Sequence, residues 1–412
     1  MSGKSITIAA PGGDKFSGYL ATPPSGSGPG LLVLQEIFGV NRHIREVTDR
    51  WAEEGYVALA PDLFWRAEPG MQLDYTPEGM QKGRALRQKL DLDLTLKDIG
   101  AALAALRARP ECQGKAGVVG YCFGGLLAYL TAARTEVDAA ISYYGGGIET
   151  RLEEARAIKC PIMFHYGEKD AAIPAAARES TRQALAGHDD AEFYVYRDAQ
   201  HGFNCNLRAS FHPFASQLAG SRSIGLLRRT MGPHYDLSAL WDQHCVDEFE
   251  IRDADATMTT MIAEPYVVHI PTLTGGRGYK DLRHFYKYHF TNRLPKDVKV
   301  VPVSRTVGSN RVVDELLLCF THDIEIDFML PGVKPTGKYV EVPHVVVVEF
   351  HGDKLACEHI YWDQASALVQ LGALERADLP VLGDEAARSL KGEQIPFNKL
   401  LPTRKDDSAG KH

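Results

Sequence analysis

The sequence contains no hydrophobic run long enough to cross a membrane. Its longest apolar run, residues 118–130, has 13 residues, whereas a membrane-spanning helix needs about 20. The first residues also lack the apolar core of a secretory signal peptide. We therefore expect a cytoplasmic protein with no membrane partner.

Paired cysteines and basic blocks are absent as well. The seven cysteines are an odd number and include no Cys-x-x-Cys pair, which argues against a disulfide framework and against a zinc ribbon. The net charge is −7, and no basic block is large enough to hold a polyanion, so we expect no nucleic-acid partner. The glycines at 117–120 do not form Gly-x-Gly-x-x-Gly, which argues against a dinucleotide site.

The chain has the composition of a folded protein and the length of two domains. Hydrophobic residues make up 44% and charged residues 24% of 412 residues, which excludes disordered, collagen-like and coiled-coil chains. Single cores stop growing near ~250–300 residues. We expect domains at 1–232 and 233–400, separated at Gly232-Pro233, and a polar tail at 401–412.

Strands and helices alternate in the first half. The best helical pattern runs from Leu92 to Leu106, and Pro110 ends it. This alternation predicts an α/β domain with a mostly parallel, doubly wound sheet, in which ligands bind at the carboxyl ends of the strands. The expected strands are Ile6–Ala9, Leu31–Gln35, Tyr56–Ala60, Ala116–Tyr121, Ala139–Tyr144, Ile162–Tyr166 and Phe193–Tyr196.

The second half has a different order of elements. Helices are expected through Leu240–Phe249 and Tyr279–Phe290, and Asp363 is expected to cap a short helix, Gln364–Leu371. Two helices followed by meandering strands predict an α+β domain with an antiparallel sheet. The expected strands are Tyr266–Ile270, Val298–Val307, Val312–Phe328, Val340–Phe350 and Lys354–Trp362.

Gly120-Tyr121-Cys122-Phe123-Gly124 is the most informative motif. It follows a β-rich run and precedes a helix-forming run, as a Gly-x-nucleophile-x-Gly elbow does. The glycines permit a sharp turn with Cys122 at its tip, and the helix N-terminus favours a thiolate there. The alternative is a buried structural cysteine between packing glycines.

Two further residues follow strands in the order that the elbow requires. Asp170 follows the strand that ends near Tyr166, and His201 follows the strand that ends at Tyr196. In α/β-hydrolases the order is nucleophile, acid, histidine. We therefore predict a catalytic triad of Cys122, Asp170 and His201, in which Asp170 orients His201 and His201 serves as base and then as acid.

The segment Gln35-Glu36-Ile37-Phe38-Gly39 ends another strand. Its position predicts an oxyanion hole built from the backbone N–H groups of Ile37 and Phe123. Glu36 has no cation near it in sequence before Arg42. It is either a solvated residue at a strand end or an acid that contacts Cys122 and controls its ionisation.

Residues 1 to about 230 resemble the dienelactone hydrolase (carboxymethylenebutenolidase) family. The resemblance implies an α/β-hydrolase fold, no metal or organic cofactor, and hydrolysis of a small ester or lactone through a thioester on Cys122. It also implies that Glu36 holds the resting thiol and shifts when substrate arrives. The matching segments are Gln35–Gly39, Ala60–Leu63, Gly120–Gly125, Tyr143–Gly145, Gly167 with Asp170, and His201–Phe203.

The sequence departs from this family where the substrate carboxylate would bind. The family places an arginine four residues after the catalytic histidine, where this chain has Cys205, and another where this chain has Met80. The departure leaves the identity of the substrate open. We expect substrate contacts from Arg84, Phe38, Tyr144 and Phe203.

Residues 233 to about 400 resemble the polyketide-cyclase-like branch of the nuclear transport factor 2 superfamily. The resemblance implies a conical α+β barrel that binds or isomerises a small molecule, with a possible homodimer through this domain. The matching segments are Asp255–Met258, Val268–Pro271, Thr274–Gly276, Phe320–His322, Pro331–Gly337 and Tyr361–Gln364.

The second domain carries polar residues on its expected strands, for most of which we expect a rim or surface position. His322 and Asp323 should point to opposite faces, because side chains alternate along a strand. No His-Glu-x-x-His motif occurs, and His284 and His289 are off one helical face, so we expect no metal. The residues concerned are His269, Glu315, His322, Asp323, Glu349, Glu358 and His359.

The leading hypothesis from the sequence is a cysteine-dependent ester or lactone hydrolase fused to a small-molecule binding or isomerase-like domain. The alternative is a non-enzymatic binding protein with a dimerising second domain. The complete set of Cys122, Asp170, His201 and Glu36 argues against that alternative.

Overall fold

The chain forms two compact units. The computed structural model describes residues 3–377 and 379–401. Contacts within the chain divide it into Met1–Tyr235 and Asp236–His412, close to the break expected at Gly232-Pro233. Of the expected polar tail, residues 402–412 lie outside the described residues.

The first unit is built on one sheet of eight strands in the order β1-β2-β4-β3-β5-β6-β7-β8. β2 pairs antiparallel with β1 and β4, and the other pairs are parallel. β2 was not expected from the sequence, because Gly18 interrupts its short apolar pattern. The strands are β1 (Lys4–Ala9), β2 (Lys15–Ala21), β3 (Gly28–Leu34), β4 (Val57–Pro61), β5 (Cys112–Tyr121), β6 (Ala140–Tyr143), β7 (Ile162–Gly167) and β8 (Ala191–Tyr196).

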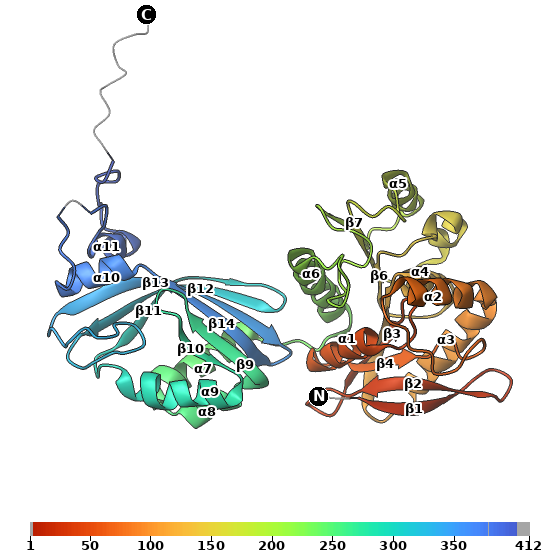
Figure 1. Ribbon diagram of the computed structural model, residues 1–412, viewed down its shortest axis with the longest axis horizontal. Coiled ribbons are helices and arrows are strands. Elements are labelled where there is room, and N and C mark those ends of the chain that lie inside the picture. Colours follow the sequence, from red (N-terminus) through yellow and green to blue (C-terminus); the bar gives the residue numbers. More distant parts are fainter. Residues whose placement is uncertain (1–2, 378, 402–412) are drawn as a thin grey trace, which may run out of the picture. The chain divides into compact units, whose positions relative to one another are not determined.

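Helices cover both faces of this sheet. Figure 1 shows α1 and α6 on one side and α3 and α4 on the other. The helix expected from Leu92 begins there, where the Asp91 side chain accepts from two backbone amides, and it ends before Pro110. The helices are α1 (Arg42–Glu53), α2 (Pro77–Lys89), α3 (Leu92–Arg107), α4 (Phe123–Arg134), α5 (Ala175–Ala184) and α6 (Pro213–Met231), with 3₁₀ turns at Ile148–Thr150 and Leu152–Ala157.

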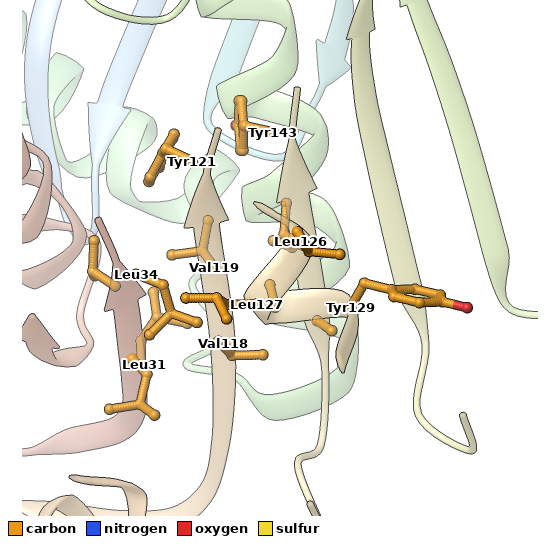
Figure 2. Close-up of a cluster of buried hydrophobic side chains, with 14 of the residues drawn as sticks. Leu31, Leu34, Val118, Val119, Tyr121, Leu126, Leu127, Tyr129 and Tyr143 are labelled. Atoms are coloured by element: carbon orange, nitrogen blue, oxygen red, sulfur yellow. The ribbon is translucent and has the colours of Figure 1, made fainter. Parts of the chain in front are cut away.

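The core of the first unit fixes the strand and helix on either side of Cys122. Figure 2 shows Val118 and Val119 of β5 beside Leu127 of α4 and Leu31 of β3. All four side chains are fully buried, and each such burial stabilises the fold by about 1.5–3 kcal/mol. Because β5 and α4 are packed in this way, the turn between them has little freedom.

The second unit contains one sheet of six strands in the order β10-β9-β14-β13-β12-β11. Four of its five strand pairs are antiparallel, as expected, whereas β14 runs parallel to β9. This pair joins strands that are distant in sequence, and such a pairing leaves no local signal. The strands are β9 (Met261–His269), β10 (Thr274–Arg277), β11 (Lys299–Val307), β12 (Arg311–Thr321), β13 (Tyr339–His351) and β14 (Lys354–Trp362).

The helices α7, α8 and α9 of the second unit lie close together in the ribbon diagram (Figure 1), and two π-helical segments follow α7 and α9 in the chain. The helix expected at Gln364–Leu371 is present, and the Asp363 side chain caps it by accepting from the amides of Ala365 and Ser366. The helices are α7 (Leu237–Cys245) with a π-helical Val246–Ile251, α8 (Ala254–Thr259), α9 (Tyr279–Phe285) with a π-helical Tyr286–Phe290 and a 3₁₀ turn Thr291–Arg293, α10 (Gln364–Leu371) and α11 (Glu385–Leu390).

The strand expected at Val312–Phe328 is shorter than the sequence suggested. β12 ends at Thr321, because the next residues turn and the amides of Thr336 and Gly337 donate to the carbonyl of His322. The strand pairs of the second unit define a sheet, and its closure into a conical barrel stays a prediction. Within the described residues, no helix is long and apolar enough to cross a membrane.

Candidate active site

Cys122 lies at the turn between β5 and α4, with a backbone that few residues other than glycine adopt. Its φ is 56° and its ψ is −111°. Both flanking glycines are required by close backbone contacts: a Cβ on Gly120 would lie 1.8 Å from the Gly124 oxygen, and one on Gly124 would lie 2.2 Å from the Leu34 oxygen. The strained turn presents the thiol at the N-terminus of α4, as the sequence motif predicts.

Asp170, His201 and Cys122 form one chain of hydrogen bonds. Asp170 Oδ2 lies 2.8 Å from His201 Nδ1, and His201 Nε2 lies 3.1 Å from Cys122 Sγ. Asp170 is 3% exposed, and its other oxygen accepts from the amide of Ala172. The carboxylate is thereby held toward the ring, and the ring toward the thiol.

The electrostatics of His201 favour a positively charged ring. Burial alone lowers the pKa of His201, but the charge of Cys122 and the hydrogen bond to Asp170 outweigh burial and raise this pKa to about 10. A negative charge on Cys122 and the Asp170 carboxylate thus both favour a proton on this ring. An imidazolium next to a cysteine stabilises the thiolate form, which is the nucleophile.

The segments expected to form an oxyanion hole meet beside Cys122. Ile37 and Phe123 both line the cavity that contains the thiol. The Gly124 amide donates to the Gln35 carbonyl at 3.0 Å and so ties the turn after β3 to the start of α4. In the part of the chain that the structure describes, neither the Ile37 amide nor the Phe123 amide donates to a backbone carbonyl.

Glu36 is buried and has two polar partners, so the interpretation of a solvated residue at a strand end is wrong, and its control of Cys122 stays a prediction. The residue is 0% exposed, its Oε1 lies 3.3 Å from Arg208 Nη1, and its Oε2 accepts from the Tyr75 hydroxyl at 2.7 Å. Among the described residues, no hydrogen bond joins Glu36 to Cys122. Local sequence could not predict this, because Arg208 is 172 positions away.

A cavity of ≈ 550 Å³ opens beside the thiol, and cationic side chains dominate its polar lining. The expected contacts Arg84 and Phe38 line it together with Met80. Sequence reasoning missed Arg208 and did not assign Arg87 or Lys169. The cations at this cavity are Arg84, Arg87, Lys169 and Arg208.

Two expected substrate contacts lie behind the triad and not in the cavity. Tyr144 and Phe203 are 0% exposed and are not lining residues of this cavity. The Tyr144 ring packs edge-on against His201 with centroids 5.2 Å apart, and Phe203 packs against Tyr144 at 5.3 Å. We therefore assign both rings to the support of His201.

In the second unit, two residues expected at a rim or surface are buried in a cavity. His269 is 4% and Glu358 2% exposed, and both line this cavity. His322 is buried and Asp323 exposed, but both follow the end of β12 at Thr321, so strand alternation is not the reason. Glu315, Glu349 and His359 are half-buried outside it. The sequence reasoning missed Glu248 and Tyr286, which line the same cavity.

Comparisons with known proteins agree on the first unit. Residues 16–231 match the dienelactone hydrolase family. The carboxymethylenebutenolidase of a Pseudomonas species is 39% identical over 231 residues, which cover 56% of this chain and 96% of that protein. The carboxymethylenebutenolidase of Pseudomonas putida is 34% identical and covers 55% of this chain and 97% of that protein.

Among solved structures, the esterase Pf2001 of Pyrococcus furiosus has a TM-score of 0.44 and 20% identity, with 56% of this chain and 93% of that chain covered. The family match and the two bacterial relatives decide the assignment. The chain belongs to the dienelactone hydrolase family and is a hydrolase that acts on esters or lactones.

Proposed function

We propose that the first unit hydrolyses a small activated ester or lactone through a thioester on Cys122. The observation that carries this proposal is the hydrogen-bonded chain from Asp170 through His201 to Cys122. A nucleophile, a base within hydrogen-bond reach and a third group that orients the base are the parts that covalent acyl transfer requires.

The reaction proceeds in two acyl-transfer steps. The Cys122 thiolate attacks the carbonyl carbon, and the amides of Ile37 and Phe123 stabilise the oxyanion. The carbon–oxygen bond of the ester breaks, and His201 gives its proton to the departing oxygen. A water molecule then attacks the thioester while His201 takes its proton, and the carbon–sulfur bond breaks, which releases the carboxylic acid and restores the Cys122 thiolate beside protonated His201. Asp170 holds the ring in place throughout.

The preferred substrate carries a carboxylate. Arg84, Arg87 and Arg208 surround the cavity, and guanidinium groups bind carboxylates with paired hydrogen bonds. Cys205 and Met80 stand where the family has arginines, and the Arg208 guanidinium supplies a positive charge in their stead. The relatives named carboxymethylenebutenolidase support a lactone as the substrate class.

Glu36 acts through Arg208. An arriving substrate carboxylate competes with Glu36 for the same guanidinium, which lies 3.3 Å from Glu36 in the free protein. Once it is released from that pair, the Glu36 carboxylate can shift toward Cys122 and accept the proton of the thiol, so that the nucleophilic thiolate forms when substrate is bound. This step couples substrate binding to the state of Cys122.

For the second unit we propose a small-molecule binding or isomerase-like domain with the nuclear transport factor 2 fold, with homodimer formation through this domain. Its cavity is lined mostly by apolar side chains, with a few polar groups that include Glu248, Glu358 and Tyr286. Cavities of this composition are typical of small-molecule sites.

Substitution of Cys122 tests the proposed hydrolysis. Cys122→Ala should reduce hydrolysis of p-nitrophenyl acetate by at least about 10³-fold, because no other group replaces the nucleophile. Cys160→Ala, which removes a buried thiol elsewhere in the same unit, is the matched control and should retain activity. Intact-mass analysis during turnover should detect an acyl adduct on the wild type and none on Cys122→Ala. Equal losses in both variants, or an adduct on Cys122→Ala, would refute the assignment.

A further inference from the structure

A cluster of three charged side chains is buried in the second unit, and the proposed hydrolysis does not use it. His244 comes from α7, Glu248 from the π-helical segment that follows, and Glu358 from β14. Their exposures are 0%, 4% and 2%. One carboxylate oxygen of each glutamate lies 3.1 Å from His244 Nε2.

Hydrogen bonding at the far side of the ring fixes the tautomer of His244. Its Nδ1 lies 2.6 Å from Thr260 Oγ1, and that hydroxyl donates its one hydrogen to the Thr257 carbonyl at 2.7 Å. The hydroxyl can therefore only accept from the ring, so Nδ1 carries a hydrogen. The lone pair of the neutral ring is then on Nε2, between the two carboxylates.

Three electron-rich atoms cannot meet in a buried site unless a cation joins them. We propose that His244 Nε2, Glu248 and Glu358 bind one divalent transition-metal ion of the Zn²⁺ type. Nitrogen and carboxylate ligands at ~2.0–2.2 Å from one ion lie roughly 3.0–3.5 Å apart, and two of the three ligand spacings here are 3.1 Å. Two carboxylates also neutralise a divalent ion, so the buried cluster carries no net charge.

The hydrogen bond to Thr260 has the role of an outer partner that orients a metal-binding histidine. Glu248 and Tyr286 both lie in π-helical segments, which are rare and are frequent at functional sites. The Tyr286 hydroxyl lies 3.4 Å from Glu358, where it can hold the carboxylate or a water on the ion.

The proposed ion borders the cavity of the second unit. Glu248, Glu358 and Tyr286 line this cavity, whose volume is ≈ 50 Å³. One water needs ~10–15 Å³ by this measure, so a few waters fit beside the ion. With three protein ligands, a position stays open toward the cavity, as in catalytic zinc sites. The apolar remainder of the wall, which includes Phe290, Leu316 and Phe328, suits an apolar ligand with one oxygen donor.

A second triplet in the chain has the spacing of metal ligands but not the charge. Glu36, His43 and Cys205 are buried with their ligand atoms within 4.8 Å of one another. Glu36, however, already contacts the Arg208 guanidinium and the Tyr75 hydroxyl. A metal ion there would be repelled by the guanidinium. The His244 cluster has no such cation among the described residues within reach of its carboxylates.

Metal retention by the full-length chain tests the proposal. Protein stripped with a chelator is dialysed against ZnCl₂ at low concentration and then against metal-free buffer, and bound zinc is measured by plasma mass spectrometry. We expect one ion per wild-type chain. Glu248→Gln and Glu358→Gln should each weaken zinc binding by at least about 100-fold, because each removes one charge from the ligand set. His289→Asn alters an exposed histidine–carboxylate pair with Asp327 and should keep the ion.

A spectroscopic readout does not depend on the folding of any variant. Wild-type protein titrated with Co²⁺ should develop the visible absorption of a low-symmetry site with nitrogen and oxygen ligands, saturating at one equivalent, and Zn²⁺ should remove it. Absence of retained zinc and of this absorption would overturn the proposal and leave a proton as the cation at Nε2. Equal zinc retention by wild type, Glu248→Gln and Glu358→Gln, with native circular dichroism, would also overturn it.

Discussion

His201 in the first unit and His244 in the second are each hydrogen-bonded at both ring nitrogens to groups that include a carboxylate, and the arrangement of these partners differs. His201 has a carboxylate on Nδ1 and a thiol on Nε2. His244 has a neutral hydroxyl on Nδ1 and two carboxylates at Nε2. In the first case the Asp170 carboxylate at Nδ1 stabilises the positive charge that the His201 ring acquires when Nε2 gains a proton. In the second case the carboxylates of Glu248 and Glu358 lie at Nε2 and attract a cation to that nitrogen.

The cavities beside the two histidines also differ, both in volume and in the charge of their lining. The cavity at His201 has ≈ 550 Å³ and its charged lining residues are arginines and a lysine, whereas the cavity near His244 has ≈ 50 Å³, a mostly apolar wall and two glutamates as its charged lining residues. The first favours an anionic organic molecule and the second a small cation. One histidine thus supports covalent chemistry and the other ligand binding, because of the groups around them.

The largest expected effect comes from removing the negative charge of Asp170, which lies beside His201 Nδ1. Asp170→Asn should lower kcat for p-nitrophenyl acetate by roughly 10³–10⁴-fold, because the amide no longer holds the ring in the required tautomer. Steady-state kinetics measure it, and Asp189→Asn in an exposed loop is the control. Loss of activity in both variants would contradict the assignment of Asp170.

The same variant should change the pH dependence of stability. In the wild type the pKa of His201 is raised to about 10, above the ~6.5 of an unfolded histidine. The stabilisation is therefore fully present below pH ~6.5 and is lost as pH rises through about 10. Thermal unfolding from pH 6 to 11 should show this loss in the wild type and a smaller one in Asp170→Asn. Identical profiles would mean that Asp170 does not stabilise the imidazolium.

The next effect concerns the ion pair that keeps Glu36 away from the thiol. Glu36→Gln leaves the Arg208 guanidinium buried without its charged partner and should destabilise the unit by about 3–5 kcal/mol. The uncompensated positive charge should also speed alkylation of Cys122 by iodoacetamide without substrate, and Arg208→Met should slow it. A pH series of alkylation rates measures this.

The double variant Glu36→Gln, Arg208→Met is the control for this pair. Because it removes both charges, it should recover much of the stability and should return alkylation toward the wild-type rate. If all four alkylation curves overlie, the pair has no influence on the thiol, and Glu36 has only a structural part.

A smaller effect is expected at the rim of the first cavity. Arg84→Ala should raise KM roughly tenfold for an ester that carries a carboxylate, since one charged contact contributes about 1.5 kcal/mol. The values for p-nitrophenyl acetate should not change, because that ester has no carboxylate. Lys82→Ala removes a nearby exposed cation that pairs with Glu68 and does not line the cavity. An equal rise in KM for both esters would argue against an anion site.

The sequence predicted the features that depend on local order. Cys122, Asp170 and His201 could be found because each follows a strand, and parallel strands bring their carboxyl ends to one edge of the sheet. Arg208 beside Glu36 could not be found, because a loop carries the guanidinium back across 172 positions. The His244 cluster joins a helix to β14, more than a hundred positions later, and only His244 and Glu248 leave a local signal, one helical turn apart.

The smallest expected effect is that of removing the second unit, which tests whether the hydrolase site is complete within the first unit. A fragment of residues 1–235 should fold and hydrolyse p-nitrophenyl acetate with the kcat of the full chain, because its sheet, triad and cavity all lie before Tyr235.

The chain should be cut after Tyr235 and not at Gly232, because Pro233 and Tyr235 pack against the first unit. A Cβ on Gly55 would lie 2.4 Å from the Tyr235 hydroxyl and 2.6 Å from Pro233, and Arg228 stacks over the Tyr235 ring at 5.0 Å. A 1–232 fragment should therefore melt at a lower temperature than 1–235 with the same kcat. An insoluble or inactive 1–235 fragment would mean that the hydrolase depends on the second unit.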